Sequence, residues 1–158
     1  MPQRAIHQRG AGAVRGRVRA LADDRNRTAH DELYVYTMGR PRFILQHVVD
    51  AYAAQTATPD TKPMGLVFAL VGLYLHVEKG FSGDQVQRVH MQLANTRRQY
   101  PRLPLPTSRG AITPLDVLSA PAGAERDAAI DRWCGSVWEA FRESRPTIVS
   151  FLRERGID

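Results

Sequence analysis

The sequence predicts an all-α protein, a single compact helical bundle of about five to six helices. Three observations favour this class. Apolar residues recur at intervals of three and four, capping residues mark helix ends, and no useful stretch alternates apolar and polar residues as a strand would. Because 158 residues suffice to bury one core, we expect one helical domain over residues 29–158.

Residues 1–28 differ from the rest in charge. They hold seven arginines against two aspartates, whereas residues 29–158 hold 15 basic and 14 acidic residues. We therefore interpret residues 1–28 as an Arg/Gly-rich mobile N-terminal arm, with a helix between Arg15 and Ala22. Nucleic acid, if bound, is expected only at this arm. The alternative is a segment translated from a start site assigned too early.

The first helix of the domain is predicted over Pro41–Gln55, after a helical or strand-like lead-in that begins at Asp31. On a helical wheel its apolar stripe consists of Ile44, Leu45, Val48, Val49 and Tyr52. On this wheel Asp50 points away from the stripe and His47 flanks it. The two residues are three apart, so they form either a hydrogen-bonded, partly exposed pair or a tether between helices.

The most apolar segment predicts a central buried helix near residues 63–79. Thr61 is placed to cap it, Pro63 suits its first turn, and Gly80 suits the position just past its end. The apolar run from Met64 to Val77 spans fourteen residues, whereas a membrane span needs about twenty. We expect a core helix and no membrane span.

Three further helices are predicted. Ser82 and Gln85 have the spacing of a capping box at the start of the next helix, and Thr113 caps a short helix that ends at Ser119. The last helical segment, Ala124–Gly156, should end or kink near Glu143 because Pro146 lacks the N–H that a helix needs. Its two tryptophans are five residues apart, which predicts one in the core and one at an interface, Trp133 and Trp138.

Polar residues on these helices form a candidate site: His47, Asp50, Tyr52, Gln55, His76 and Glu78. His76 lies at the end of a groove of small residues, so it either closes a packing groove through a hydrogen bond or forms the floor of a pocket. Glu78 is two residues on, about 160° around the helix, so the pair cannot chelate one metal ion.

A metal site would need histidines from three helices to converge, and the candidates are His47, His76 and His90. Their spacing does not require this, so we expect no metal or other cofactor, with an unidentified divalent metal as the alternative. Cys134 has no base at a suitable spacing and is interpreted as packed. A single cysteine cannot form an intrachain disulfide, which is typical of a cytoplasmic protein.

Four strings in the same order resemble a family of bacterial helical proteins catalogued only as a domain of unknown function. They are "QHVVDAYAAQ", "FALVGLYLHVEKGFSGDQVQRVHMQLA", "RGAITPLDVLSAP" and "RWCGSVWEAF". The resemblance covers residues 33–157 and implies a small cytoplasmic all-α protein without an assigned activity. Some members begin with a Cys-x-x-Cys-Gly segment, which this chain lacks, so a metal-linked role of that segment does not transfer.

Three functions remain open. The leading hypothesis is a non-enzymatic interaction or structural module that associates with a copy of itself or with another protein, because no catalytic constellation is visible. The second is a metal- or small-molecule-binding bundle enzyme that uses His47 and His76. The third is a nucleic-acid accessory protein that acts through residues 1–28.

Overall fold

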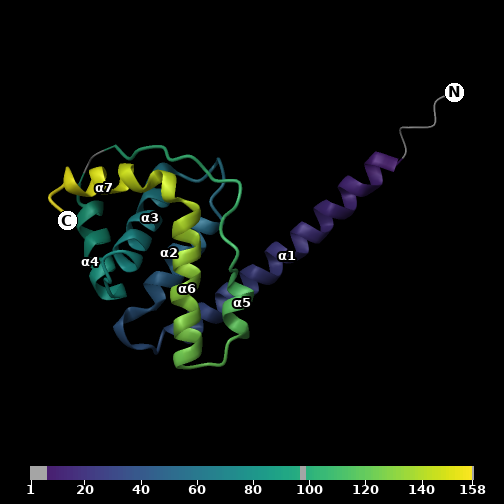
Figure 1. Ribbon diagram of the computed structural model, residues 1–158, viewed down its shortest axis with the longest axis horizontal. Helices are drawn as coiled ribbons and strands as arrows, with labels where there is room; N and C mark the ends of the chain where they lie inside the picture. Colours follow the sequence, from purple (N-terminus) through teal and green to yellow (C-terminus); the bar gives the residue numbers. More distant parts are fainter. Residues whose placement is uncertain (1–6, 97–98, 158) are drawn as a thin grey trace.

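The structure, a computed structural model, describes residues 7–96 and 99–157 and confirms the all-α class (Figure 1). The described residues form seven α-helices, two short 3-10 helices and no strand. In chain order the elements are α1 (His7–Thr37), η1 (Pro41–Phe43), α2 (Leu45–Gln55), α3 (Pro63–Val77), α4 (Gly83–Ala94), α5 (Pro114–Ser119), α6 (Ala124–Ala140), η2 (Arg142–Ser144) and α7 (Arg145–Arg153). None of the described helices is long and apolar enough to cross a membrane.

Helix α3 is the predicted central helix. It packs against α2, α4, α6 and α7, and every side chain from Leu66 to Leu75 except Phe68 is buried. The expected cap is wrong in detail, because Lys62 is the N-cap residue and makes no side-chain bond, whereas Thr61 accepts from the backbone N–H of Thr58. The helix ends at Val77, and Gly80 follows in the left-handed region at φ 70°.

The connection from α1 to α2 differs from the prediction, which began a regular helix at Pro41. Arg42 and Phe43 have φ values of 61° and 55°, so the chain turns through the left-handed region and α2 begins only at Leu45. This turn presses the Phe43 carbonyl against the backbone of Gly83, where a β-carbon would lie 1.7 Å from that oxygen. Glycine at position 83 therefore permits the approach of α4 to this turn.

The buried face of α2 is rotated from the predicted stripe. His47 and Asp50 are buried with Ala51 and Ala54, whereas 38% of Val49 is exposed. The small alanine side chains let α3 pack closely along this face, and the two polar residues are carried inside with them. The expectation of a partly exposed His47–Asp50 pair is therefore wrong.

The later elements follow the sequence closely. Both capping boxes are present, at Ser82 and at Thr113. The last segment breaks as predicted, because α6 ends at Ala140 and α7 starts one residue before Pro146. Trp133 and Trp138 are both buried in the described chain. The expectation that one of the two lies at an interface is therefore wrong.

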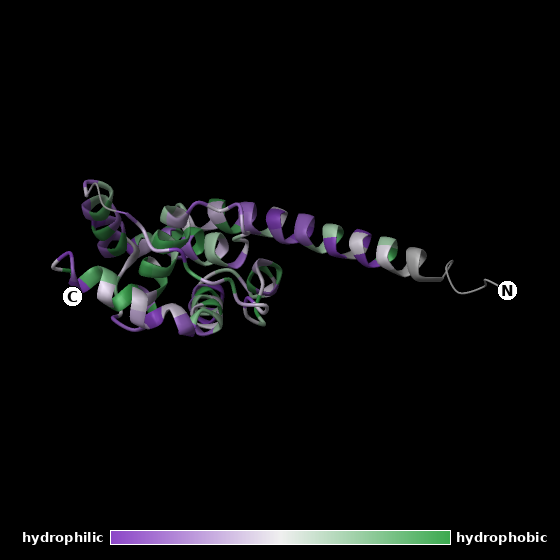
Figure 2. Cartoon of the chain, turned by 90° about the horizontal axis from the view of Figure 1, so that it is seen from above, coloured by the Kyte–Doolittle hydropathy of each residue, from purple (hydrophilic) through white to green (hydrophobic). Residues whose placement is uncertain are grey.

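Helix α1 continues across residue 28, the predicted end of the arm, and residues 1–6 of that arm lie outside the described residues. Its C-terminal half packs on the bundle through Ala29, Leu33 and Thr37, which are buried. Its N-terminal half projects from the body, with hydrophobic turns between hydrophilic ones (Figure 2). The helix expected between Arg15 and Ala22 is thus part of a longer one.

Candidate functional site

Two histidines from neighbouring helices lie face to face inside the bundle. The rings of His47 on α2 and His76 on α3 have centroids 3.5 Å apart and planes inclined by 18°. Stacked rings direct their nitrogens sideways in parallel planes rather than toward a common point between them. The pair therefore joins α2 to α3 through ring contact.

Both ring nitrogens of His76 have partners. Its Nδ1 lies 3.0 Å from the Phe81 carbonyl oxygen, which the turn at Gly80 brings back over the helix end, and its Nε2 lies 2.9 Å from Asp131 Oδ1 on α6. A carbonyl and a carboxylate both accept hydrogen bonds, so each ring nitrogen of His76 has an acceptor in place. Both nitrogens are therefore engaged by contacts to the segment after α3 and to α6.

His47 is the inner ring of the stack. Burial, followed by the charge of His76, lowers the pKa of His47 from 6.5 to about 3, so the ring is neutral at physiological pH. Its Nδ1 is buried without a hydrogen-bond partner among the described residues. The backbone carbonyl of His47 accepts a hydrogen bond from the Cys134 thiol at 3.7 Å, and burial raises the pKa of that thiol, in keeping with a packed cysteine.

Asp50 lies one turn along α2 from His47, with only 3% of its surface exposed. Burial raises the pKa of its carboxyl well above 3.8, opposed by a hydrogen bond from Gln46. Its Oδ2 has no hydrogen-bond partner among the described residues and packs against Gly72, where a β-carbon would lie 1.8 Å away. The carboxyl group thus fills the space that a side chain at position 72 would occupy.

His90 belongs to a second hydrogen-bond network, which reaches Asp50 through Gln46. The Gln46 amide nitrogen lies 3.0 Å from Asp50 Oδ1 and 3.4 Å from His90 Nδ1. His90 Nε2 donates to the Phe68 carbonyl at 2.8 Å, which leaves Nδ1 to accept from the amide. This network joins α2, α3 and α4. The ring of His90 stacks on Phe68 rather than on the other two histidines.

The remaining candidates each join separate elements. Tyr52 stacks on His30 of α1 at 3.9 Å, and the Gln55 amide donates to the Ile112 carbonyl at 2.8 Å while its oxygen accepts from the Trp133 indole at 3.0 Å. Glu78 accepts from the Trp138 indole and from Arg145, both at 2.9 Å. The Arg145 hydrogen bond, ahead of the others, lowers the pKa of Glu78.

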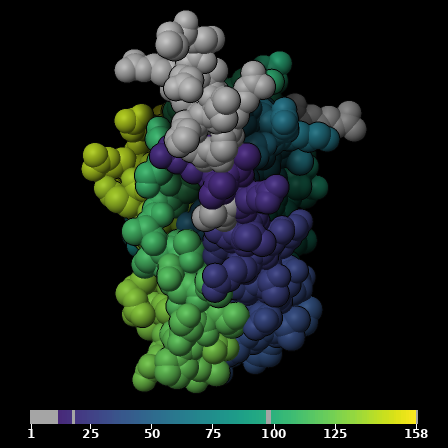
Figure 3. All heavy atoms as spheres, turned by 90° about the vertical axis from the view of Figure 1, so that its right-hand side faces the viewer, coloured from purple at the N-terminus to yellow at the C-terminus, as the bar shows by residue number. Residues whose placement is uncertain are grey.

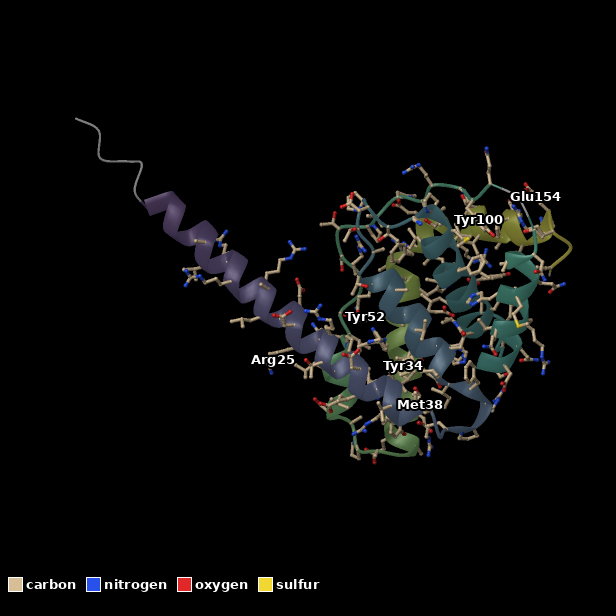
Figure 4. All side chains as sticks on the ribbon, turned by 180° about the vertical axis from the view of Figure 1, so that it is seen from behind. Arg25, Tyr34, Met38, Tyr52, Tyr100 and Glu154 are labelled. Atoms are coloured by element: carbon tan, nitrogen blue, oxygen red, sulfur yellow. The ribbon has the colours of Figure 1, made fainter. Side chains whose placement is uncertain are left out.

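The six candidates therefore do not converge on one cavity. The structure joins His47 to His76 and links Asp50 to His90 through Gln46. Tyr52 (labelled in Figure 4) and Gln55 line one cavity of about 540 Å³, whereas Glu78 does not line it. Within residues 7–96 and 99–157, no group of three or more His, Cys, Asp or Glu side chains is placed to hold a metal ion.

Two members of these networks were missed in the sequence. Gln46 stands four residues before Asp50, a spacing at which helical side chains meet, so the signal was present. Asp131 is 55 residues from His76 and carries no local signal of its role. Only the packing of α6 on α3 brings these two residues together.

Comparison with known proteins assigns a family without an activity. No curated protein and no solved structure matches the chain. A family model described as a family of unknown function, DUF5946, matches residues 26–142, which include all the candidate site residues. Since this match covers most of the sequence, the chain is a member of the DUF5946 family of unknown function.

Proposed function

We propose that this protein is a non-enzymatic interaction module that binds a helix of another protein chain along the outward surface of α1. We call this surface the α1 face and define it by Leu21, Arg25, Thr28, Glu32 and Val35. All five residues are exposed, with 63% of Leu21 and 67% of Val35 accessible to solvent. The observation that carries the proposal is this pair of large apolar residues on a helix that projects beyond its own bundle.

The interior supports the same assignment. The polar side chains that would serve a catalytic site are used to hold helices together, as in the His76 ring, whose two nitrogens lie at hydrogen-bond distance from Phe81 and Asp131. The His47 ring is stacked beneath it and buried. Chemistry at this cluster would require breaking contacts between α2, α3 and α6.

The arginines of α1 favour a protein partner over a nucleic acid. Arg15 and Arg19 are four residues apart and lie on one side of the helix, whereas Arg17 projects on the opposite side, so the three arginines do not share one face. A phosphate backbone is best followed by cations on one face. The α1 face instead combines apolar residues with both signs of charge.

Site-specific photo-crosslinking in living cells tests the proposal. A photoreactive residue replaces Leu21 or Val35, and a matched control carries it at Met91, which is 63% exposed on α4. We expect protein adducts from the two α1 positions and none from position 91. Adding Arg25→Glu should abolish the adducts at both α1 positions. Equal adducts at position 91, or none at either α1 position, would contradict an interaction role for the α1 face.

A further inference from the structure

We infer that the partner of the α1 face is a second copy of this chain, bound antiparallel about a two-fold axis near Thr28. This inference rests on the proposed interaction role of the same surface. It follows from how the residues of the α1 face are arranged along the helix. An isologous pair requires a surface that is complementary to itself after a two-fold rotation.

The apolar residues meet this requirement. Leu21 and Val35 each lie seven residues from Thr28, which is about 10.5 Å along the axis on either side. An antiparallel copy centred on Thr28 therefore places each Leu21 opposite the second copy's Val35. The seven-residue spacing is also the one at which two helices keep a shared seam.

The charges agree with the same alignment. Arg25 and Glu32 are nearly equidistant from Thr28 on opposite sides, so the rotation brings each arginine to the second copy's glutamate. Within the described part of the chain, neither residue takes part in an ion pair. On the other flank the same rotation brings Asp24 near the second copy's Asp31, and Arg27, which lies 2.7 Å from Asp24, reduces this repulsion.

The position of the α1 face leaves room for a second copy. A groove of about 330 Å³ lies between α1 and α5, where Leu21 is joined by Leu115 and Leu118, with Arg25 and Glu32 along the same lining. Figure 3 shows the two segments side by side on one surface of the molecule. Buried Ala29 and Leu33 lie on the opposite side of α1, so the two bundles would stand on opposite sides of the helix pair.

Sedimentation velocity of full-length variants in which one charged residue is reversed tests the inference. We expect the wild type to dimerise, and Arg25→Glu or Glu32→Arg to raise the dissociation constant by about tenfold or more, since each creates two like-charge pairs. The double variant with both changes should dimerise again, and so should a mixture of the two single variants. Leu21→Asp should abolish the dimer, whereas Met91→Asp, its control of equal exposure, should not.

The outcomes separate this inference from the proposed function. A wild type that is monomeric at every concentration, or a double variant that does not recover, overturns the antiparallel dimer. If a photoreactive residue at position 35 nevertheless crosslinks to a different protein, the interaction role stands and only the identity of the partner is wrong. Circular dichroism of each variant confirms that it is folded, so that loss of the dimer is not mistaken for unfolding.

Discussion

The Asp50 carboxyl group lies directly against the backbone of Gly72, on the helix that α2 packs against most extensively. We therefore predict that Gly72→Ala is destabilising by about 1–3 kcal/mol, because the added carbon needs space that a buried carboxyl oxygen holds. Chemical denaturation measures this loss. Gly65→Ala is the control on the same helix, since its nearest contact is an ordinary 3.8 Å, and it should leave stability unchanged or raise it.

Combining Gly72→Ala with Asp50→Ala checks the cause. The double variant should lose less stability than the sum of the two single variants, because removing the carboxyl group makes room for the new β-carbon. Strict additivity would mean that the two positions do not compete for space.

His47 predicts a loss of stability in acid. Its pKa falls from 6.5 in the unfolded chain to about 3 in the folded protein, so the unfolded state binds the proton first. Stability from this group is complete above pH 6.5 and declines as pH falls toward 3, by about 4–5 kcal/mol in all. His47→Gln should flatten this dependence in urea titrations between pH 7 and 4. Parallel curves for the two proteins would contradict a buried neutral imidazole.

Asp50 predicts the opposite dependence. Its folded pKa is raised above the unfolded value of 3.8, so the folded state binds the proton more tightly. The stabilisation that follows is complete below pH 3.8 and is lost as pH rises toward the folded pKa. Asp50→Asn cannot ionise and should gain stability relative to the wild type as pH rises from 4 to 8. A constant difference between the two proteins over that range would show that Asp50 is ionised in both states.

Leu70→Ala should cost roughly 2–5 kcal/mol, because Leu70 is fully buried in α3 and its removal leaves a cavity among packed helices. Met64→Ala in the first turn of the same helix is the control, since 48% of Met64 is exposed, and it should cost less than about 1 kcal/mol. Urea unfolding of both variants measures the difference. A loss of stability below 1 kcal/mol for Leu70→Ala would show that α3 is not at the centre of the core.

The sequence predicted those parts of the fold that local chemistry decides. The apolar run of α3, the capping boxes at Ser82 and Thr113, and the break before Pro146 each depend on residues within a few positions of one another. The face that α2 buries could not be predicted in the same way. Val48 and Val49 are equally apolar, and only the closeness of α3 decides that Asp50 goes inside while Val49 stays exposed.

The candidate residues show the same limit. All of them except Glu78, which lies just past the end of α3, stand on the predicted helices. Their partners, however, are distant in sequence, as in the contact of His76 with Asp131 and of Trp133 with Gln55. A histidine that could serve as a ligand and one that ties helices together have the same local pattern. The difference lies in whether both ring nitrogens already have partners, and that depends on where α6 packs.

The turn between α1 and α2 has a consequence for protein engineering. Arg42 and Phe43 both hold left-handed backbone conformations, which cost side-chain-bearing residues roughly 1 kcal/mol each, and the resulting carbonyl position leaves no room for a β-carbon at Gly83. A library that diversifies this region should therefore keep position 83 fixed. Arg42→Gly is the favourable first substitution, because glycine adopts the required angles without that cost.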